Sequence, residues 1–109
     1  MSDQKSPNQI FDLSGKVAIV TGGSRGLGFE MSRAFAAVGA NVVIASRKLE
    51  PCETAAALIQ EASGQDCIGT TYHAGNWEDS ERLVDLAYDR FGHVDVLVNN
   101  AGMSPLYES

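Results

Sequence analysis

The most restrictive feature of this sequence is the alternation of short apolar runs with longer segments of helical periodicity. The apolar runs lie at residues 17–20, 42–45, 67–74 and 94–98, and we predict each of them as a β-strand. Between the runs, apolar residues recur at spacings of three and four, as they do on the buried face of a helix. This order predicts βαβ units, in which right-handed crossover helices join parallel strands.

The three intervening segments each end at a glycine, the residue that commonly follows the last helical turn. The predicted helices span residues 27–39, 51–64 and 77–92, each counted to its final glycine. Pro51 suits the first turn of the second helix, and the acidic residues after Trp77 suit the start of the third. The predicted fold is of the α/β class: a Rossmann-type, doubly wound parallel sheet of four strands in the order 3-2-1-4.

This predicted sheet is incomplete for a Rossmann-type fold. The fourth strand lies at an open edge, although its residues 96–98 are as apolar as a central strand buried on both faces. The third strand is rich in Thr and Tyr, which places it nearer the sheet edge. We therefore predict a polar tail at residues 1–12 and a partial Rossmann-type domain at residues 13–109, cut after the fourth strand.

Composition and charge exclude several functional classes. The formal net charge of -6 argues against a nucleic-acid partner, because such proteins need a surplus of Lys and Arg. No apolar run approaches the roughly 20 residues that span a bilayer, and the first residues are polar, so we expect a cytoplasmic protein without a membrane partner. Cys52 and Cys67 are too few for a disulfide framework or zinc site and are predicted to be reduced, partly buried thiols.

The turn after the first strand carries the strongest functional signal, because several glycines there lead directly into a helix. Glycines permit a tight turn, let the backbone approach a pyrophosphate, and present N–H groups at the positive helix end. No Lys-Ser or Lys-Thr pair follows, which excludes a nucleoside-triphosphate P-loop. A plain glycine-rich turn is the alternative to a dinucleotide site. The predicted site residues in this turn are Gly22, Gly23, Ser24, Arg25, Gly26, Leu27 and Gly28.

The identity of the dinucleotide is predicted from Ser46 and Arg47, at the end of the second strand. An acidic residue at this place would bind the ribose 2'-hydroxyl of NAD, whereas Arg47 can form charge-assisted hydrogen bonds with the 2'-phosphate of NADP. Arg25 is a candidate second cation for the same phosphate, although an isolated arginine is commonly a solvated surface residue. We therefore predict NADP, as NADPH, over NAD.

These motifs resemble those of the short-chain dehydrogenase/reductase family over residues 13–102. Thr21-Gly22-x-x-x-Gly26-x-Gly28 is similar to the family's cofactor motif, and residues 99–102 read Asn-Asn-Ala-Gly, as in the family's segment after the fourth strand. The resemblance implies that this segment steadies the sheet while Asn99 and Gly102 lie beside the cofactor ribose. Without the family, the same four residues are a good turn, and this alternative is strongest for Asn100.

One departure from the family follows the third strand, where the family often has an Asp that binds the adenine amino group. This chain has His73 in that place, and an imidazole can accept one hydrogen bond or stack on a base. Backbone groups of His73 and Ala74 can contribute instead. His93, in the turn before the fourth strand, is predicted to be an exposed residue without a functional role.

A second departure is the absence of the family's catalytic Tyr-x-x-x-Lys pair. The only lysines, Lys5, Lys16 and Lys48, all precede the first tyrosine, Tyr72, so this pair cannot occur within the 109 residues. Ser104 and Tyr107 follow Asn99 too closely to replace the family's catalytic residues, and we predict no catalytic or metal-ligating residue here.

Two functional predictions therefore remain. The first is the N-terminal part of an NADP-dependent oxidoreductase acting on a small carbonyl or alcohol, a homo-oligomer when full length. The second is a non-catalytic nucleotide-binding or interaction fragment. A methyltransferase is less favoured because it would carry an acid after the second strand, where this chain has Ser46 and Arg47.

Overall fold

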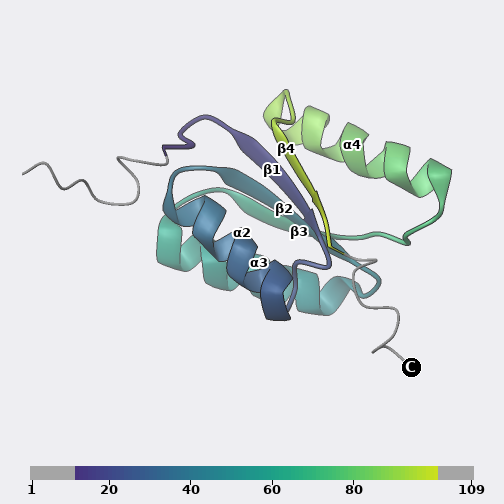
Figure 1. The fold of residues 1–109 in the computed structure, drawn as a ribbon, viewed down its shortest axis with the longest axis horizontal. Helices are drawn as coiled ribbons and strands as arrows, with labels where there is room; N and C mark the ends of the chain where they lie inside the picture. The colour runs from purple at the N-terminus through teal and green to yellow at the C-terminus, as the bar shows by residue number, and fades with distance from the viewer. Residues whose placement is uncertain (1–11, 101–109) are drawn as a thin grey trace, which may run out of the picture.

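A computed structural model of the chain describes residues 12–100, and these residues form a parallel sheet covered by helices on both faces. Helices α2 and α3 cover one face, and α4 covers the other (Figure 1). The strand order is β3-β2-β1-β4, so the predicted α/β class and the predicted order are confirmed. The strands are β1 (Val17–Thr21), β2 (Asn41–Ser46), β3 (Cys67–Thr71) and β4 (Val96–Asn99), and the helices are α2 (Gly26–Ala37), α3 (Leu49–Ser63) and α4 (Trp77–Phe91).

The core lies on both faces of β1 and β2, which explains why their sequences are continuously apolar rather than alternating. Successive side chains of a strand point to opposite faces. Val20 and Ile44 therefore belong to the cluster under α2 and α3, whereas Ile19 and Val43 belong to the cluster under α4. All five residues of β1 are buried.

Three predicted boundaries are wrong by two or three residues. Strand β3 ends at Thr71 rather than residue 74, because the chain turns through Gly75, which has a φ of +87°. Strand β4 begins at Val96 rather than residue 94. Helix α3 begins at Leu49, two residues before Pro51, which remains within the first turn, where a helix needs no N–H donor.

The ends of the helices agree with the glycine signals in the sequence. Gly64 and Gly92 adopt left-handed conformations after α3 and α4, and their N–H groups bond to Gln60 and Tyr88. Within residues 12–100, no helix is long and apolar enough to cross a membrane. The predicted tail at residues 1–12 falls almost entirely outside the described residues.

Candidate functional site

The carboxyl ends of the four strands lie at one edge of the sheet. Thr21 is paired with Ala45 on one side and with Asn99 on the other, and Ser46 is paired with Thr71. The crossovers run outward in opposite directions from β1, so the boundary between β1 and β4 is the topological switch point, where open α/β sheets bind their ligands. The predicted site residues that the structure describes all lie at one of these strand ends or in the segment that follows it.

The glycine turn between β1 and α2 depends on backbone conformations that favour glycine. Gly22 and Gly26 have φ angles of +68° and +62°, in the left-handed region that strains other residues. The N–H of Gly22 donates to the carbonyl oxygen of Ala45, 2.6 Å away, which ties the turn to β2. The conformation of this turn is therefore set by its glycines and by the bond to β2.

Close packing at Gly28 brings the first turn of α2 against the glycine turn. A Cβ atom at Gly28 would lie 2.0 Å from the carbonyl oxygen of Gly22, and one at Gly23 would lie 2.9 Å from that of Val20. The hydroxyl of Ser32 donates to the carbonyl oxygen of Gly28 at 2.9 Å. Only glycine fits at Gly28, and its small size holds the N-terminus of α2 at the carboxyl edge of the sheet.

The N-terminus of α2 is suited to bind an anion. Among the helices described in residues 12–100, α2 alone has no acidic residue in its first turn, whereas α3 has Glu50 and α4 has Glu78 and Asp79. No side chain caps α2, while the Asn76 side chain accepts from the Asp79 N–H at the start of α4. The first N–H groups of α2 lack intrahelical partners, and the helix dipole makes this end positive.

A hydrogen-bonded network joins the glycine turn to the end of β4. The Asn100 N–H donates to the Thr21 hydroxyl oxygen at 2.9 Å, and the Asn100 side-chain amide donates to the Gly22 carbonyl oxygen at 3.3 Å. The Thr21 hydroxyl lies 3.2 Å from both the Val98 carbonyl oxygen and Asn99 Oδ1 and can donate to either.

The resemblance implied that residues 99–102 steady the sheet, but sequence reasoning did not predict the contact of Asn100 with Thr21. The two residues are separated by 79 positions, and only the adjacency of β1 and β4 could have indicated the contact. Gly102, which was predicted to lie beside the ribose, falls outside the described residues.

Arg25 and Arg47 lie exposed beside the ends of β1 and β2. Neither guanidinium has a hydrogen bond or an ion pair with any residue in the described part of the chain, in contrast to Arg33, Arg82 and Arg90. As far as residues 12–100 show, neither cation is occupied by an acidic side chain, and both lie at the edge where an anion would bind.

Ser46, the last residue of β2, is held by contacts with α3 and with the loop that precedes this helix. Its hydroxyl oxygen lies 2.9 Å from Cys52 Sγ in α3 and donates to the Lys48 carbonyl oxygen at 3.4 Å. Burial raises the pKa of the Cys52 thiol, and it raises that of Cys67 to about 11, so both stay protonated near neutral pH. Both cysteines are free thiols, as predicted, and both are buried.

His73 follows β3, and its backbone is held by the first turn of α4. The N–H of His73 donates to Asp79 Oδ2 at 2.6 Å, and the imidazole Nδ1 lies 3.5 Å from the same oxygen. Asp79 also accepts from Arg82 Nε at 2.8 Å, and this hydrogen bond is the main reason that the pKa of Asp79 is lowered. The imidazole itself is largely exposed, as is Ala74.

His93 lies in the turn before β4, as predicted, but it is only partly exposed and is paired with an acidic side chain. Its Nδ1 lies 2.7 Å from Asp95 Oδ2, which also accepts from the Val17 N–H at 2.9 Å. Because Val17 starts β1, this pair lies at the amino edge of the sheet, opposite the candidate site. The hydrogen bond from the Val17 N–H joins the start of β4 to β1 and is the main reason that the pKa of Asp95 is lowered, and His93 lowers it further.

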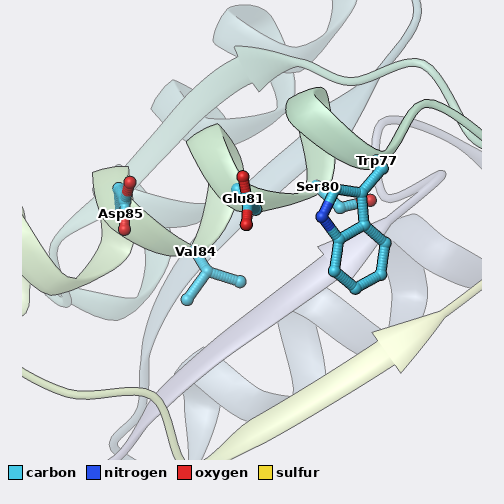
Figure 2. A pocket seen from close by; sticks show the side chains of 5 residues that line it. All are labelled: Trp77, Ser80, Glu81, Val84 and Asp85. Atoms are coloured by element: carbon cyan, nitrogen blue, oxygen red, sulfur yellow. The ribbon is translucent and has the colours of Figure 1, made fainter.

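Other features of the described residues add no second site. In residues 12–100, no group of His, Cys, Asp and Glu side chains could hold a metal ion. A shallow depression on α4 is lined by Trp77, Ser80, Glu81, Val84 and Asp85, and Figure 2 shows Trp77 and Val84 projecting from the same side of the helix. The candidate site therefore rests on the glycine turn and the neighbouring strand ends.

Comparison with known proteins agrees with the family resemblance over most of the chain. The sequence model of the family described as "short chain dehydrogenase" matches residues 16–109. Dehydrogenase/reductase SDR family member 4 from Oryctolagus cuniculus is 44% identical over 95 residues, which are 87% of this chain and 36% of the relative. The Homo sapiens protein of that name is 42% identical over 97 residues, 89% of this chain and 34% of the relative. The chain thus spans about a third of the length of these curated relatives.

Solved structures share the fold. L-sorbose reductase from Gluconobacter frateurii, determined with NADPH and L-sorbose, has a TM-score of 0.79 and 34% identity, covering 84% of this chain and 35% of that protein. Hydroxysteroid dehydrogenase from Escherichia coli has a TM-score of 0.79 and 30% identity, covering 86% and 39%. With a family match across residues 16–109, glycines fixed at the switch point and the 3-2-1-4 sheet, this chain belongs to the short-chain dehydrogenase/reductase family.

Proposed function

We propose that this chain forms the cofactor-binding part of an NADP-dependent oxidoreductase acting on a carbonyl or alcohol group. The observation that carries the proposal is the glycine cradle at the uncapped N-terminus of α2, where a Cβ at Gly28 would lie 2.0 Å from the Gly22 oxygen. Such a cradle lets a pyrophosphate approach the backbone and the positive helix end. The residues present therefore fit a dinucleotide.

We assign one part of the cofactor to the residues at each strand end. The turn from Gly22 to Gly28 holds the pyrophosphate; Ser46, Arg47 and Arg25 lie near the 2'-phosphate. His73 and Ala74 border the adenine, and Asn99 and Gly102 border a ribose. Bound NADPH would supply the hydride, and the residues named here bind and orient it.

The preference for NADP over NAD rests on charge. Ser46, Arg47 and Lys48 follow one another at the end of β2, so no carboxylate from these positions would repel a 2'-phosphate. Arg25 and Arg47 have no anionic partner within residues 12–100 that would compete with that phosphate. The L-sorbose reductase structure, which contains NADPH, supports the same preference.

The remaining parts of the proposal come from the sequence. Residues 13–109 form a partial cofactor-binding domain, and the proton-transferring Tyr-x-x-x-Lys pair lies outside the 109 residues, which cannot contain it. We further propose a cytoplasmic, homo-oligomeric protein whose partners are the dinucleotide and a small carbonyl or alcohol, with no nucleic acid or membrane.

Titration of the chain with NADPH and NADH, followed by nicotinamide fluorescence, tests this proposal. NADPH should bind more tightly, and Arg47→Ala should weaken NADPH binding about tenfold or more while leaving NADH unchanged, since a charge-assisted hydrogen bond contributes about 1.5–3 kcal/mol. Arg33→Ala is the matched control, because Arg33 is exposed on α2 and paired with Glu30. Equal affinity for the two cofactors would overturn the NADP preference, and binding of S-adenosylmethionine without NADPH would overturn the function.

A further inference from the structure

Strand β3 is an outer strand of the sheet, and its sequence is suited to pair with an identical strand. Residues 67–72 read Cys-Ile-Gly-Thr-Thr-Tyr, a run without a charge or a proline and with several residues that favour strands. An uncharged outer strand of this kind offers its free backbone groups to the same strand of another copy. The order β3-β2-β1-β4 leaves one side of β3 without a neighbouring strand within residues 12–100. The side chains around this edge therefore decide whether two copies can join there.

The hydrogen bonds with β2 show which backbone groups of β3 point away from the sheet. The Tyr72 N–H donates to the Ser46 carbonyl oxygen at 2.8 Å, so the backbone of Tyr72 points to β2. The N–H and C=O groups of successive residues point to opposite sides of a strand, so every second residue back from Tyr72 also points to β2. The Asp66 carbonyl oxygen agrees with this register, because it accepts from the Val42 N–H at 3.1 Å. The residues of β3 that point outward are Cys67, Gly69 and Thr71.

Gln60 of α3 occupies the first outward group of the strand. Its side-chain oxygen Oε1 accepts from the Cys67 N–H at 3.0 Å. The missing side chain of Gly69 brings α3 close to β3, since a Cβ atom there would lie 2.5 Å from the backbone carbonyl carbon of Cys52. The Cys67 N–H is therefore already bonded within the chain.

Arg82 of α4 occupies the last outward group of the strand. Its Nη2 donates to the Thr71 carbonyl oxygen, and its Nη1 donates to the Thr70 hydroxyl at 3.2 Å. Its Nε donates to Asp79 Oδ1 at 2.8 Å, which fixes the guanidinium in this place. Because α3 and α4 cover opposite faces of the sheet (Figure 1), Gln60 and Arg82 close the edge of β3 from both faces.

We propose that Gln60 and Arg82 keep β3 from pairing with β3 of a second copy of this chain. An antiparallel pair centred on Gly69 would place Cys67 of one copy opposite Thr71 of the other. In that pair the Cys67 N–H would donate to the Thr71 carbonyl oxygen of the second copy. These are the two groups that Gln60 and Arg82 already occupy. The inference does not depend on cofactor binding, so it stands apart from the proposed function.

The test is the double variant Gln60→Ala/Arg82→Ala, compared with the wild-type chain by sedimentation velocity at increasing concentration. The double variant frees in each copy both groups that the pair needs, so it should dimerise at least about tenfold more tightly than the wild-type chain. Amide exchange locates the contact. Exchange of the Gly69 N–H should slow as the concentration of the double variant rises, whereas in the wild-type chain it should not depend on concentration.

Two further variants separate pairing at β3 from other association. Adding Thr71→Pro to the double variant should abolish the dimer, because proline fits an outward position of an outer strand but has no N–H to donate. The control is Arg33→Ala/Glu61→Ala, which truncates exposed side chains of α2 and α3 away from this edge. That variant should associate no more than the wild-type chain.

If the double variant does not fold, Gln60→Ala alone decides the question. This single variant frees the Cys67 N–H and should show the same changes to a smaller extent. Association equal to that of the wild-type chain would overturn the inference. Association of the variant without slower exchange of the Gly69 N–H would also overturn it, because the contact would then lie elsewhere.

Discussion

Strands β1 and β4 lie side by side and carry similar apolar runs, yet they are buried to very different degrees. Ile19 of β1 and Leu97 of β4 are register partners, and partners in adjacent strands point to the same face of a sheet. Ile19 is 0% exposed and packs with Leu83 and Ala87 of α4, whereas Leu97 is 60% exposed. The apolar character of a strand thus does not determine its burial, which depends on what covers it.

The two strands are consequently held by different interactions. β1 is fixed by packing on both faces, and α2 reaches it only because glycines allow close contact. β4 is fastened to β1 by polar groups at its two ends: Asp95 on the Val17 N–H at one end, and Asn99 and Asn100 on Thr21 at the other. Variants that remove packing should therefore affect the β1 side most, and variants that remove hydrogen bonds should affect β4.

The largest effect is expected from Gly28→Ala, which places a methyl group 2.0 Å from a backbone oxygen that cannot yield. We expect a loss of more than about 4 kcal/mol in the free energy of unfolding, since rigid backbone overlap is among the most destabilising changes. Gly75→Ala is the control, because Gly75 also has a special backbone (φ +87°) but open space around it. That variant should lose only about 1–2 kcal/mol. Equal losses in urea denaturation would contradict the steric explanation.

The next effect compares the register partners directly. Ile19→Ala removes a fully buried side chain and should cost about 3–4 kcal/mol, whereas Leu97→Ala should cost less than about 1 kcal/mol. The measurement is the midpoint of urea denaturation at constant slope. A similar cost for both variants would show that Leu97 is covered in solution by something that residues 12–100 do not supply.

A smaller effect is expected at the network that joins the glycine turn to β4. Thr21→Val keeps the shape of the side chain but removes the oxygen that accepts from the Asn100 N–H. The loss should be about 1–2 kcal/mol, the usual consequence of leaving a partly buried donor unpaired. Thr71→Val is the control at the same sheet edge, because the Thr71 hydroxyl has no hydrogen bond with residues 12–100. Amide exchange at Asn100 should accelerate in the first variant only.

The sequence was sufficient to predict the elements and their order, because the apolar runs and the terminal glycines are local signals. It missed three boundaries by two or three residues. At β4, the Asp95 N–H donates to the Val17 carbonyl oxygen, but the regular strand begins only at Val96. The prediction that the fourth strand lies at an open edge agrees with the structure, in which β4 ends the sheet and Leu97 is exposed although its sequence is as apolar as that of a central strand.

The candidate site was predictable only where its residues are adjacent in sequence. The glycine turn could be recognised because all of its residues are adjacent in sequence, but the Asn100 contact with Gly22 spans 78 positions and carries no local signal. The Asp79 contact with His73 spans only six positions. The acidic residues after Trp77 indicated the start of this helix, but they did not indicate that the second oxygen of Asp79 accepts from the His73 N–H.

The smallest effect at neutral pH is expected at the other end of β4, and it should grow as the pH falls. The Val17 N–H and, to a lesser degree, His93 hold the pKa of Asp95 below its ordinary value of 3.8. A carboxyl whose pKa is lowered by folding stabilises the protein above its unfolded value, and this contribution is lost as the pH drops through the folded pKa. Below about pH 4 the wild-type chain should lose this contribution progressively. Asp95→Asn should therefore lower the melting temperature at pH 7 and flatten the decline of the melting temperature below pH 4. The control is Asp89→Asn, because Asp89 is exposed and has no hydrogen bond in residues 12–100. This variant should follow the wild-type curve. Parallel curves for Asp95→Asn and the wild type would mean that β4 is held at this end by packing, as β1 is, and not by the carboxylate.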